Sequence, residues 1–252
     1  MITKQRFNEL VEKYETKEFI KDDPIQFPHM FKTKEDIEIA GFLASLFSYG
    51  NRKLFIPKLL TLFNIMKMQP YKYILNFNYN CKDLDDFDYR FSKGCDIKEI
   101  ILILQKLYKT DNSSLETLFM YGWNTHKTIK GMLITVCDYF YANLQNEVTK
   151  GFYHLIPDAH KSSALKRMNM FLRWMVRDGS VDLGIWNKLP KEELIIPLDV
   201  HVGRLSVETG LIKKSNGDFK TAMEITNVLK SFDSKDPVKY DFALFGYGVN
   251  NK

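Results

Sequence analysis

Apolar residues recur at helical spacing along most of this chain, and this period constrains its fold more than any other feature. Residues 33–50 carry a stripe at intervals of three and four, formed by Ile37, Ala40, Ala44 and Phe47. Thr33 stands just before this segment with Asp36 three positions later, which is typical of a capped helix start. Gly50 is a natural helix end. The segment is therefore predicted to be a largely buried helix.

The same period returns in several later segments. It predicts helices at 96–109, 126–146 and 162–177, after Asp199, after Asp218 and from Pro237. Residues 78–95 are acidic, aromatic and irregular, so we expect a loop or short turns there. Alternating two-residue patterns are short and rare. We therefore expect an all-α fold of about ten helices, in which residues 1–252 form a single helical domain with two lobes.

Composition narrows the class of protein. Hydrophobic residues make up 45% of the 252 residues, enough for a substantial core. A run of about 18 apolar residues, which a membrane-spanning helix would need, is missing from the sequence. The first residues lack the apolar segment of a signal peptide, so we expect a cytoplasmic protein. The three scattered cysteines fit a reducing compartment and cannot supply four thiolates for an iron–sulfur cluster.

The predicted helix at 162–177 carries cations on one face. Ser162 or Ser163 is a candidate cap, and the polar face consists of Lys166, Asn169, Arg173 and Arg177. Lys161 and Arg167 add positive charge, and residues 161–177 contain no aspartate or glutamate. One interpretation is an ordinary solvated face. A solvated face usually mixes acids with bases, because opposite charges four residues apart stabilise a helix. The one-sided charge, together with a net charge of +5, favours an anionic partner such as a phosphate backbone.

A second helix is predicted to begin on an aspartate. Pro197 disfavours helical geometry in the residue before it, so the helix can start only near Asp199. Aspartate is among the best N-caps and stabilises a helix start by about 1 kcal/mol. Capping alone would explain this residue.

The surrounding motifs suggest more than capping. Asp199 lies in the motif PLDVHVGRL at 197–205, 33 positions after Lys166 of the predicted helix at 162–177. Gly210-Leu211-Ile212 follows the motif. This combination, over residues 163–212, resembles the catalytic region of helix-hairpin-helix DNA glycosylases of the 8-oxoguanine type, with the spacing of archaeal members. The whole chain also resembles a bacterial family of unknown function, through the motifs SSALKRMNMFLRWMVRDG, VDLGIW, IPLDVHVGRL and SYGNR.

The resemblance implies a role for individual residues. Lys166 corresponds to the lysine nucleophile and Asp199 to the aspartate that assists it. The candidate DNA contacts are His201, Arg204, Arg167, Arg173, Lys161, Asn51 and Arg52. Met170 corresponds to a side chain against the flipped base, and we add Phe245 and Tyr247 as candidate lining of that base pocket. The chain departs from the family at PDAHKSSALK, which lacks the glycine-rich turn that holds a phosphate.

These assignments predict a DNA repair glycosylase with AP lyase activity, acting on an oxidised purine such as 8-oxoguanine in double-stranded DNA. The implied enzyme is a monomer without a cofactor or a metal ion. Its fold would have a DNA groove between two lobes. The damaged base must be flipped out of the duplex into a pocket, because its glycosidic bond is unreachable inside the stack.

The chemistry needs an uncharged amine and an ionised carboxyl. A lysine with the reference pKa of about 10.4 is neutral in roughly one molecule in 2,500 at pH 7. Cationic neighbours such as Arg167 and Arg173, together with burial, favour the neutral amine. A carboxylate at a helix N-terminus stays ionised and can stabilise a developing sugar cation. Asp199 is therefore expected to act as both cap and catalyst.

Two other classes of protein remain open. A non-catalytic helical DNA-binding protein would use the basic face without needing Lys166 and Asp199 together. A metal-dependent hydrolase would combine Asp199 and His201 with ligands from His154, Asp158 or His160.

Overall fold

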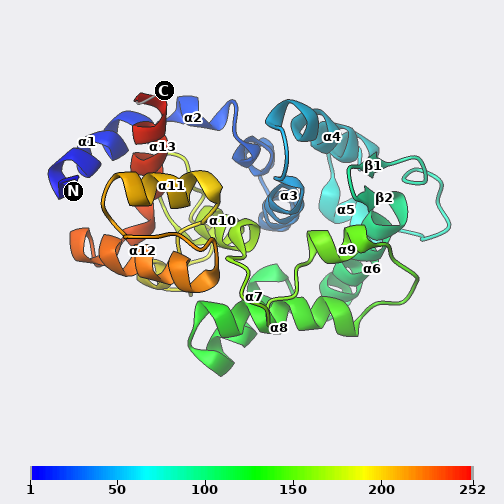
Figure 1. Ribbon diagram of the computed structural model, residues 1–252. Coiled ribbons are helices and arrows are strands. Elements are labelled where there is room, and N and C mark those ends of the chain that lie inside the picture. Colours follow the sequence, from blue (N-terminus) through cyan, green and yellow to red (C-terminus); the bar gives the residue numbers. More distant parts are fainter. Residues whose placement is uncertain (1, 251–252) are drawn as a thin grey trace. The chain divides into compact units, whose positions relative to one another are not determined.

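The computed structural model describes residues 2–250 and confirms the all-α fold (Figure 1). Within these residues the chain forms thirteen α-helices and four short 3-10 helices. The strands of the described part are β1 (Asp88–Tyr89) and β2 (Ser92–Lys93), which pair antiparallel as one small hairpin. This hairpin lies in the segment expected to be irregular.

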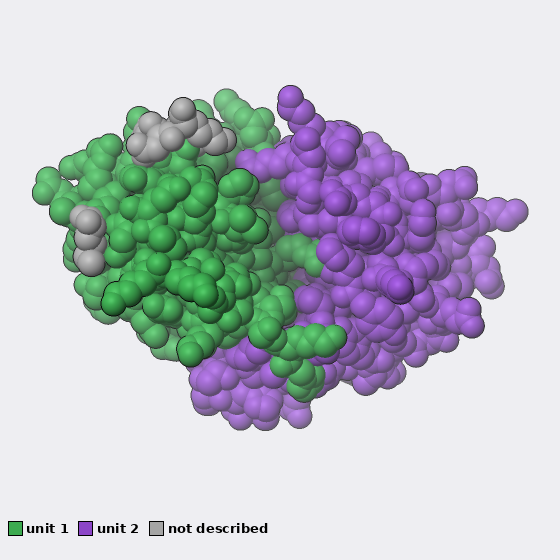
Figure 2. Space-filling model, viewed as in Figure 1, with its two compact units in different colours: residues 1–25, 160–252 green, residues 26–159 purple. Residues whose placement is uncertain are grey.

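The chain divides into two compact units, coloured in Figure 2. Unit 1 comprises the residues up to Ile25 and those from His160 onward, and unit 2 comprises Gln26–Ala159. The helices of unit 1 are α1 (Lys4–Tyr14), α2 (Lys17–Ile20), α10 (Lys166–Val176), η3 (Lys191–Glu193), α11 (Val200–Glu208), α12 (Phe219–Phe232), η4 (Pro237–Lys239) and α13 (Tyr240–Asn250); η1 (Pro24–Gln26) crosses the boundary. Those of unit 2 are η2 (Pro28–Met30), α3 (Lys34–Phe47), α4 (Arg52–Ile65), α5 (Pro70–Leu75), α6 (Gly94–Lys109), α7 (Leu115–His126), α8 (Ile129–Ala142) and α9 (Lys150–Leu155).

Unit 1 joins the two ends of the described chain around one apolar cluster. Helix α1 packs along α13, and α11 packs against the same α13. The cluster draws its side chains from all of these helices and from α12, with Phe7, Leu10, Leu205, Ile225, Tyr240 and Leu244 among its members. Burying large apolar side chains of this kind stabilises a fold by about 1.5–3 kcal/mol each. The N-terminal helix is therefore an integral part of the unit that contains Lys166 and Asp199.

Unit 2 is built around the helix that the stripe at 33–50 predicted. The Thr33 hydroxyl accepts a hydrogen bond from the Asp36 N–H at 3.3 Å, which confirms the predicted cap. Of the stripe residues of α3, Ala40, Ala44 and Phe47 are buried and Ile37 is half-buried. The Phe42 ring lies 5.4 Å from that of Phe140 on α8. Cys137 is fully buried on α8, and burial raises the pKa of its thiol to about 12.

The start of the basic helix differs from the prediction. Helix α10 begins at Lys166, and the residue before it, Leu165, has a left-handed backbone with φ +51° and no capping side chain. Ser162 and Ser163 do not cap the helix. The Ser162 carbonyl instead accepts from the Phe219 N–H at 2.8 Å, and Ser163 forms a bridge with Asp218. A non-local pairing therefore draws both serines toward the start of α12.

None of the helices within residues 2–250 combines the length and the apolar character that crossing a bilayer requires.

Candidate active site on helices α10 and α11

Two segments of unit 1 bring the predicted pair of residues together. Lys166 is the first residue of α10, and Asp199 is the N-cap of α11. The Lys166 Nζ lies 3.0 Å from the Asp199 Oδ2, although the two residues are 33 positions apart in the chain. Their side chains are 35% and 30% exposed, so solvent can reach both. The contact that the family resemblance implied is therefore present.

The two oxygens of Asp199 have different partners. Oδ1 accepts the backbone N–H of Val202 at 2.8 Å, which confirms the predicted cap, and Oδ2 pairs with the amine. Capping holds the carboxylate in one orientation, because the helix start fixes where Oδ1 must lie. Gly210, with φ +77°, follows the end of α11 at Glu208. A short, well-capped helix thus aims one oxygen at Lys166.

The electrostatic surroundings keep Asp199 ionised. Partial burial would raise its pKa, but the positive charge of Lys166, the Val202 N–H and the charge of His201 together lower the pKa below its usual value. A carboxyl group with a lowered pKa rarely holds a proton at neutral pH and therefore stays negatively charged. Near the sugar it could stabilise a cation that develops during reaction.

Beyond Lys166, the polar face of α10 does not lie in solvent as a basic surface. Asn169 is buried and donates its side-chain amide to the Ala164 carbonyl at 3.0 Å. Arg173 is only 4% exposed; its Nε lies 3.2 Å from Asp182, and its Nη1 pairs with Asp241. The prediction that Arg173 contacts DNA is wrong, because its donors are used inside the unit. Its charge is also compensated, so it does not provide the cationic field expected beside Lys166.

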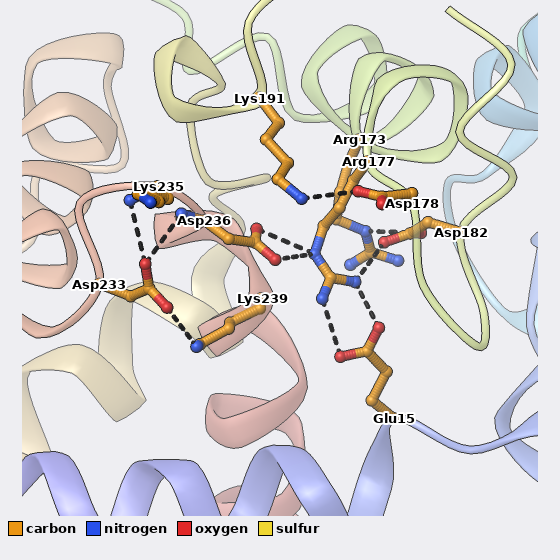
Figure 3. A network of polar contacts seen from close by, with 10 residues as sticks. All are labelled: Glu15, Arg173, Arg177, Asp178, Asp182, Lys191, Asp233, Lys235, Asp236 and Lys239. Atoms are coloured by element: carbon orange, nitrogen blue, oxygen red, sulfur yellow. Dashed lines mark hydrogen bonds and ion pairs between the residues drawn. The ribbon is translucent and has the colours of Figure 1, made fainter. Parts of the chain in front are cut away.

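Arg177 is bound even more extensively (Figure 3). Its guanidinium donates to both oxygens of Glu15, at 2.5 and 2.8 Å, and to Asp182 at 2.9 Å. Its Nε also lies 2.9 Å from an oxygen of Asp236. Although burial opposes the charge, these carboxylates raise the pKa of Arg177. The acids missing from the helix itself thus come from distant segments, and the network ties α10 to the end of α1 and the start of α13.

Asp241, on α13, is a member of the site that the sequence interpretation missed. Its side chain is 17% exposed and pairs with Arg173. Burial raises its pKa to about 6; the charges of Arg173 and Lys166 oppose the rise, and those of Asp199 and Asp182 add to it. Its charge therefore acts on both members of the predicted catalytic pair. One signal could have pointed to it: Asp241 stands one helical turn before the candidate pocket residue Phe245.

The candidate pocket residues are buried to different degrees. Met170, one turn after Lys166, is buried, and Tyr247 packs partly against the unit 1 cluster. The Phe245 ring is 37% exposed and lies 5.9 Å from Tyr14 and 5.0 Å from Phe19. Met170 and Phe245 thus each follow a charged residue of the site by one turn. Their role around a base stays a prediction.

The remaining candidate DNA contacts of unit 1 lie at its surface. Lys161 and His201 are exposed, and Arg167 is half-buried. Arg204 is exposed and pairs with Glu208 at 2.6 Å, one turn along the same helix. Exposed pairs of this type are worth only a few tenths of a kcal/mol, so a phosphate could compete for the guanidinium. None of these positions conflicts with the prediction.

Asn51 and Arg52 belong to unit 2, at the corner between α3 and α4. The Asn51 side chain accepts the Lys53 N–H at 2.9 Å and caps α4. Both residues are exposed. The polar corner expected from SYGNR is therefore present, and its backbone is fixed by the cap.

Nothing in the described part of the fold supports the metal-hydrolase alternative. Among residues 2–250, no three histidine, cysteine, aspartate or glutamate side chains come together as a set that could hold a metal ion.

Comparison with known proteins gave one match. The model of a family described as "Protein of unknown function (DUF2400)" matches residues 23–250. Neither the curated proteins nor the solved structures contain a significant match to the chain. The match agrees with the likeness to a family of unknown function; the likeness of residues 163–212 to glycosylases stays a prediction.

Proposed function

The chain belongs to the DUF2400 family, and we propose that it is a DNA glycosylase with lyase activity that removes an oxidised purine, such as 8-oxoguanine, from double-stranded DNA. One observation carries the proposal. An amine and a permanently ionised carboxylate, 33 positions apart in the chain, lie 3.0 Å apart where solvent can reach both. An ion pair needed only for stability could have formed anywhere, and a half-exposed one contributes little to stability.

The proposed reaction begins when the deprotonated Lys166 amine attacks C1′ of the flipped nucleotide. The new nitrogen–carbon bond forms as the glycosidic bond breaks, and the base leaves with the bonding electrons and a proton. The nitrogen lone pair then forms the C1′=N bond as the C1′–O4′ bond breaks, and O4′ takes up a proton from water, which gives a protonated Schiff base. Transfer of a C2′ proton to water next forms the C2′=C3′ bond as the C3′–O3′ bond breaks, so the 3′ phosphate leaves and the strand is cut. Covalent catalysis of this type divides one difficult step into easier ones.

Asp199 would act on the charge that develops during this sequence. Positive charge accumulates on the sugar as the base departs, and a fixed carboxylate lowers the free energy of that state. Because its pKa is lowered, Asp199 remains negative throughout the neutral range. Its second oxygen is held by the Val202 N–H, so little reorganisation is needed when the sugar becomes positive.

The test is covalent trapping. The protein is incubated with duplexes that each contain one lesion, and borohydride reduces any Schiff base to a stable protein–DNA adduct. We expect an adduct with at least one oxidised purine, its absence in Lys166→Gln, and its retention in Lys213→Gln, a matched exposed lysine of the same unit. The absence of an adduct with every lesion would refute the lysine mechanism.

The same samples examine the non-catalytic alternative. If Lys166→Gln and Asp199→Asn both match the parent protein in every DNA assay, the protein is a DNA-binding module and the pair is structural.

A further inference from the structure

An exposed arginine and an exposed phenylalanine form the tip of the hairpin in unit 2. Tyr89 pairs with Ser92, so Arg90 and Phe91 make up the whole turn between β1 and β2. Phe91 is 54% exposed, and Arg90 is also exposed. We name the group formed by Tyr49, Arg90, Phe91 and His154 the Arg90 cluster.

The turn is formed by residues that do not favour it. Arg90 has a left-handed backbone with φ +54°, a conformation that usually falls to glycine, asparagine or aspartate in two-residue hairpins. For other residues it costs roughly 1–2 kcal/mol. Strain of this kind concentrates at binding and catalytic sites. Folding of the hairpin alone would be better served by glycine at the first position of the turn, so the arginine there needs another explanation.

The Arg90 cluster brings a guanidinium group together with three rings, of which His154 lies edge-on to both Tyr49 and Phe91. The Arg90 guanidinium carbon lies 5.9 Å from the centre of the Tyr49 ring and 5.5 Å from that of Phe91. The His154 ring lies 4.4 Å from Tyr49 and 5.2 Å from Phe91. The rings orient the guanidinium, while its exposure leaves the charge within reach of an anion.

The hairpin is fastened to the corner that contains Asn51 and Arg52. The Tyr49 hydroxyl donates to the Tyr89 carbonyl at 3.0 Å, and the Tyr89 hydroxyl donates back to the Tyr49 carbonyl. Gly50 has φ +80°, and a Cβ at this position would lie 2.5 Å from the Arg90 Nη1. The backbone at Gly50 therefore favours glycine, and the missing side chain leaves room for the guanidinium. The tip and the SYGNR corner are joined by these contacts.

Two acidic residues near the tip are paired with lysines. Asp88 lies 3.3 Å from Lys93 and 3.7 Å from Lys58, and Asp85 pairs with Lys98. These pairs offset part of the negative charge of the preceding loop. Arg90 and Phe91, at the tip, are both exposed.

We propose that this surface binds DNA, with Phe91 stacking on a nucleobase and Arg90 contacting the adjoining phosphate. Aromatic rings and guanidinium groups that stack on bases are the common means by which proteins hold unpaired nucleotides. A protein partner could cover an exposed phenylalanine but would not require the strained arginine beside it. The inference rests on the proposed function for the choice of DNA as the ligand, and it takes an unpaired base of a duplex as the partner of the Phe91 ring.

The experiment uses a fluorescent base and does not depend on catalysis. The full-length protein is titrated into a duplex with 2-aminopurine opposite a stable abasic analogue, and binding and fluorescence are recorded. We expect stacking to quench the fluorescence. Phe91→Ala should weaken binding about 5- to 100-fold, as expected for the loss of one base–aromatic stack, and abolish the quenching. Phe91→Trp should restore both.

Tyr121→Ala is the matched control, because Tyr121 is a 67% exposed aromatic of the same unit outside the Arg90 cluster. It should bind like the parent. The proposal is overturned if Phe91→Ala binds and quenches like the parent protein, or if Tyr121→Ala loses as much affinity. Thermal unfolding of each variant checks the fold. The two proposals fail separately. If Phe91→Ala weakens binding but no adduct is trapped, the DNA-binding surface stands and the lysine mechanism is refuted. If adducts are trapped but Phe91→Ala has no effect, the lysine mechanism stands and the role of Phe91 is refuted.

Discussion

Lys166 and Arg173 lie two turns apart on α10, yet their surroundings are opposite. Lys166 has one carboxylate within 3.0 Å and is 35% exposed, whereas Arg173 is 4% exposed between two carboxylates. One end of the helix thus presents a cation that solvent and ligands can reach, and the other end uses cations to fasten the helix in place. Residues of the same charge on the same face are therefore accessible at one end and bound inside the unit at the other. The buried arginines hold the helix that positions the amine.

The largest effect is expected from Lys166→Arg, which keeps the charge and removes the nucleophile. We expect at least about a 10³-fold loss of base excision, since loss of a covalent nucleophile is among the most damaging changes to an enzyme. Duplex binding and unfolding temperature should stay close to those of the parent protein. Single-turnover excision and thermal unfolding measure the two quantities. Substantial excision by this variant would mean that the lysine acts only as a charge.

The structural end of the helix should respond in the opposite way. Arg177→Met leaves Glu15, Asp182 and Asp236 without the arginine, and breaking a buried ion pair on one side costs about 3–5 kcal/mol. Urea unfolding measures this loss. Arg204→Met is the comparison, because its exposed pair with Glu208 is worth under about 1 kcal/mol. Equal stability of the two variants would mean that the network does not hold α10.

Asp241 connects the two ends and should make stability depend on pH. Its pKa is raised from 3.8 to about 6, so between these values the folded protein holds a proton that the unfolded chain has released. Its contribution is therefore complete below about pH 4 and is lost as the pH rises through 6, by up to about 3 kcal/mol. Asp199 and Asp178, whose pKa values are lowered, act in the opposite direction and at lower pH.

The measurement compares the free energy of unfolding at pH 4.5 and 6.5. Lowering the pH from 6.5 to 4.5 should stabilise the parent protein relative to Asp241→Asn, because the asparagine cannot take up the proton. If the two proteins show the same difference, Asp241 does not carry the raised pKa.

The smallest effect separates the two roles of Asp199. Asp199→Ala should cost about 1 kcal/mol of stability through loss of the cap, while Asp199→Asn should cost less, since asparagine caps equally well. Excision should fall in both variants, because both lack the negative charge. Excision that follows stability, with Asn close to the parent and Ala reduced, would assign Asp199 to capping alone.

Features that depend on neighbours in the chain could be predicted from the sequence. Thr33, Asp199 and Asp218 cap helices as expected, since the cap side chain accepts a hydrogen bond from the backbone N–H only three residues later in the chain. The burial of α3 followed from its stripe. The cap of α10 could not be predicted in this way, because its serines pair with the start of α12.

The sequence by itself determined that the chain is helical, where most helices begin, and that cations gather on one face of α10. Only the tertiary structure decided which of those cations are buried, because the partners of Arg173 and Arg177 come from residues as distant as Glu15 and Asp241. Helical periodicity shows which side chains share a face, but solvent exposure depends on what packs against that face. The same reason hid the hairpin tip, since a two-residue turn with an arginine in a left-handed conformation contradicts local preference and persists through its contacts with Tyr49 and Gly50.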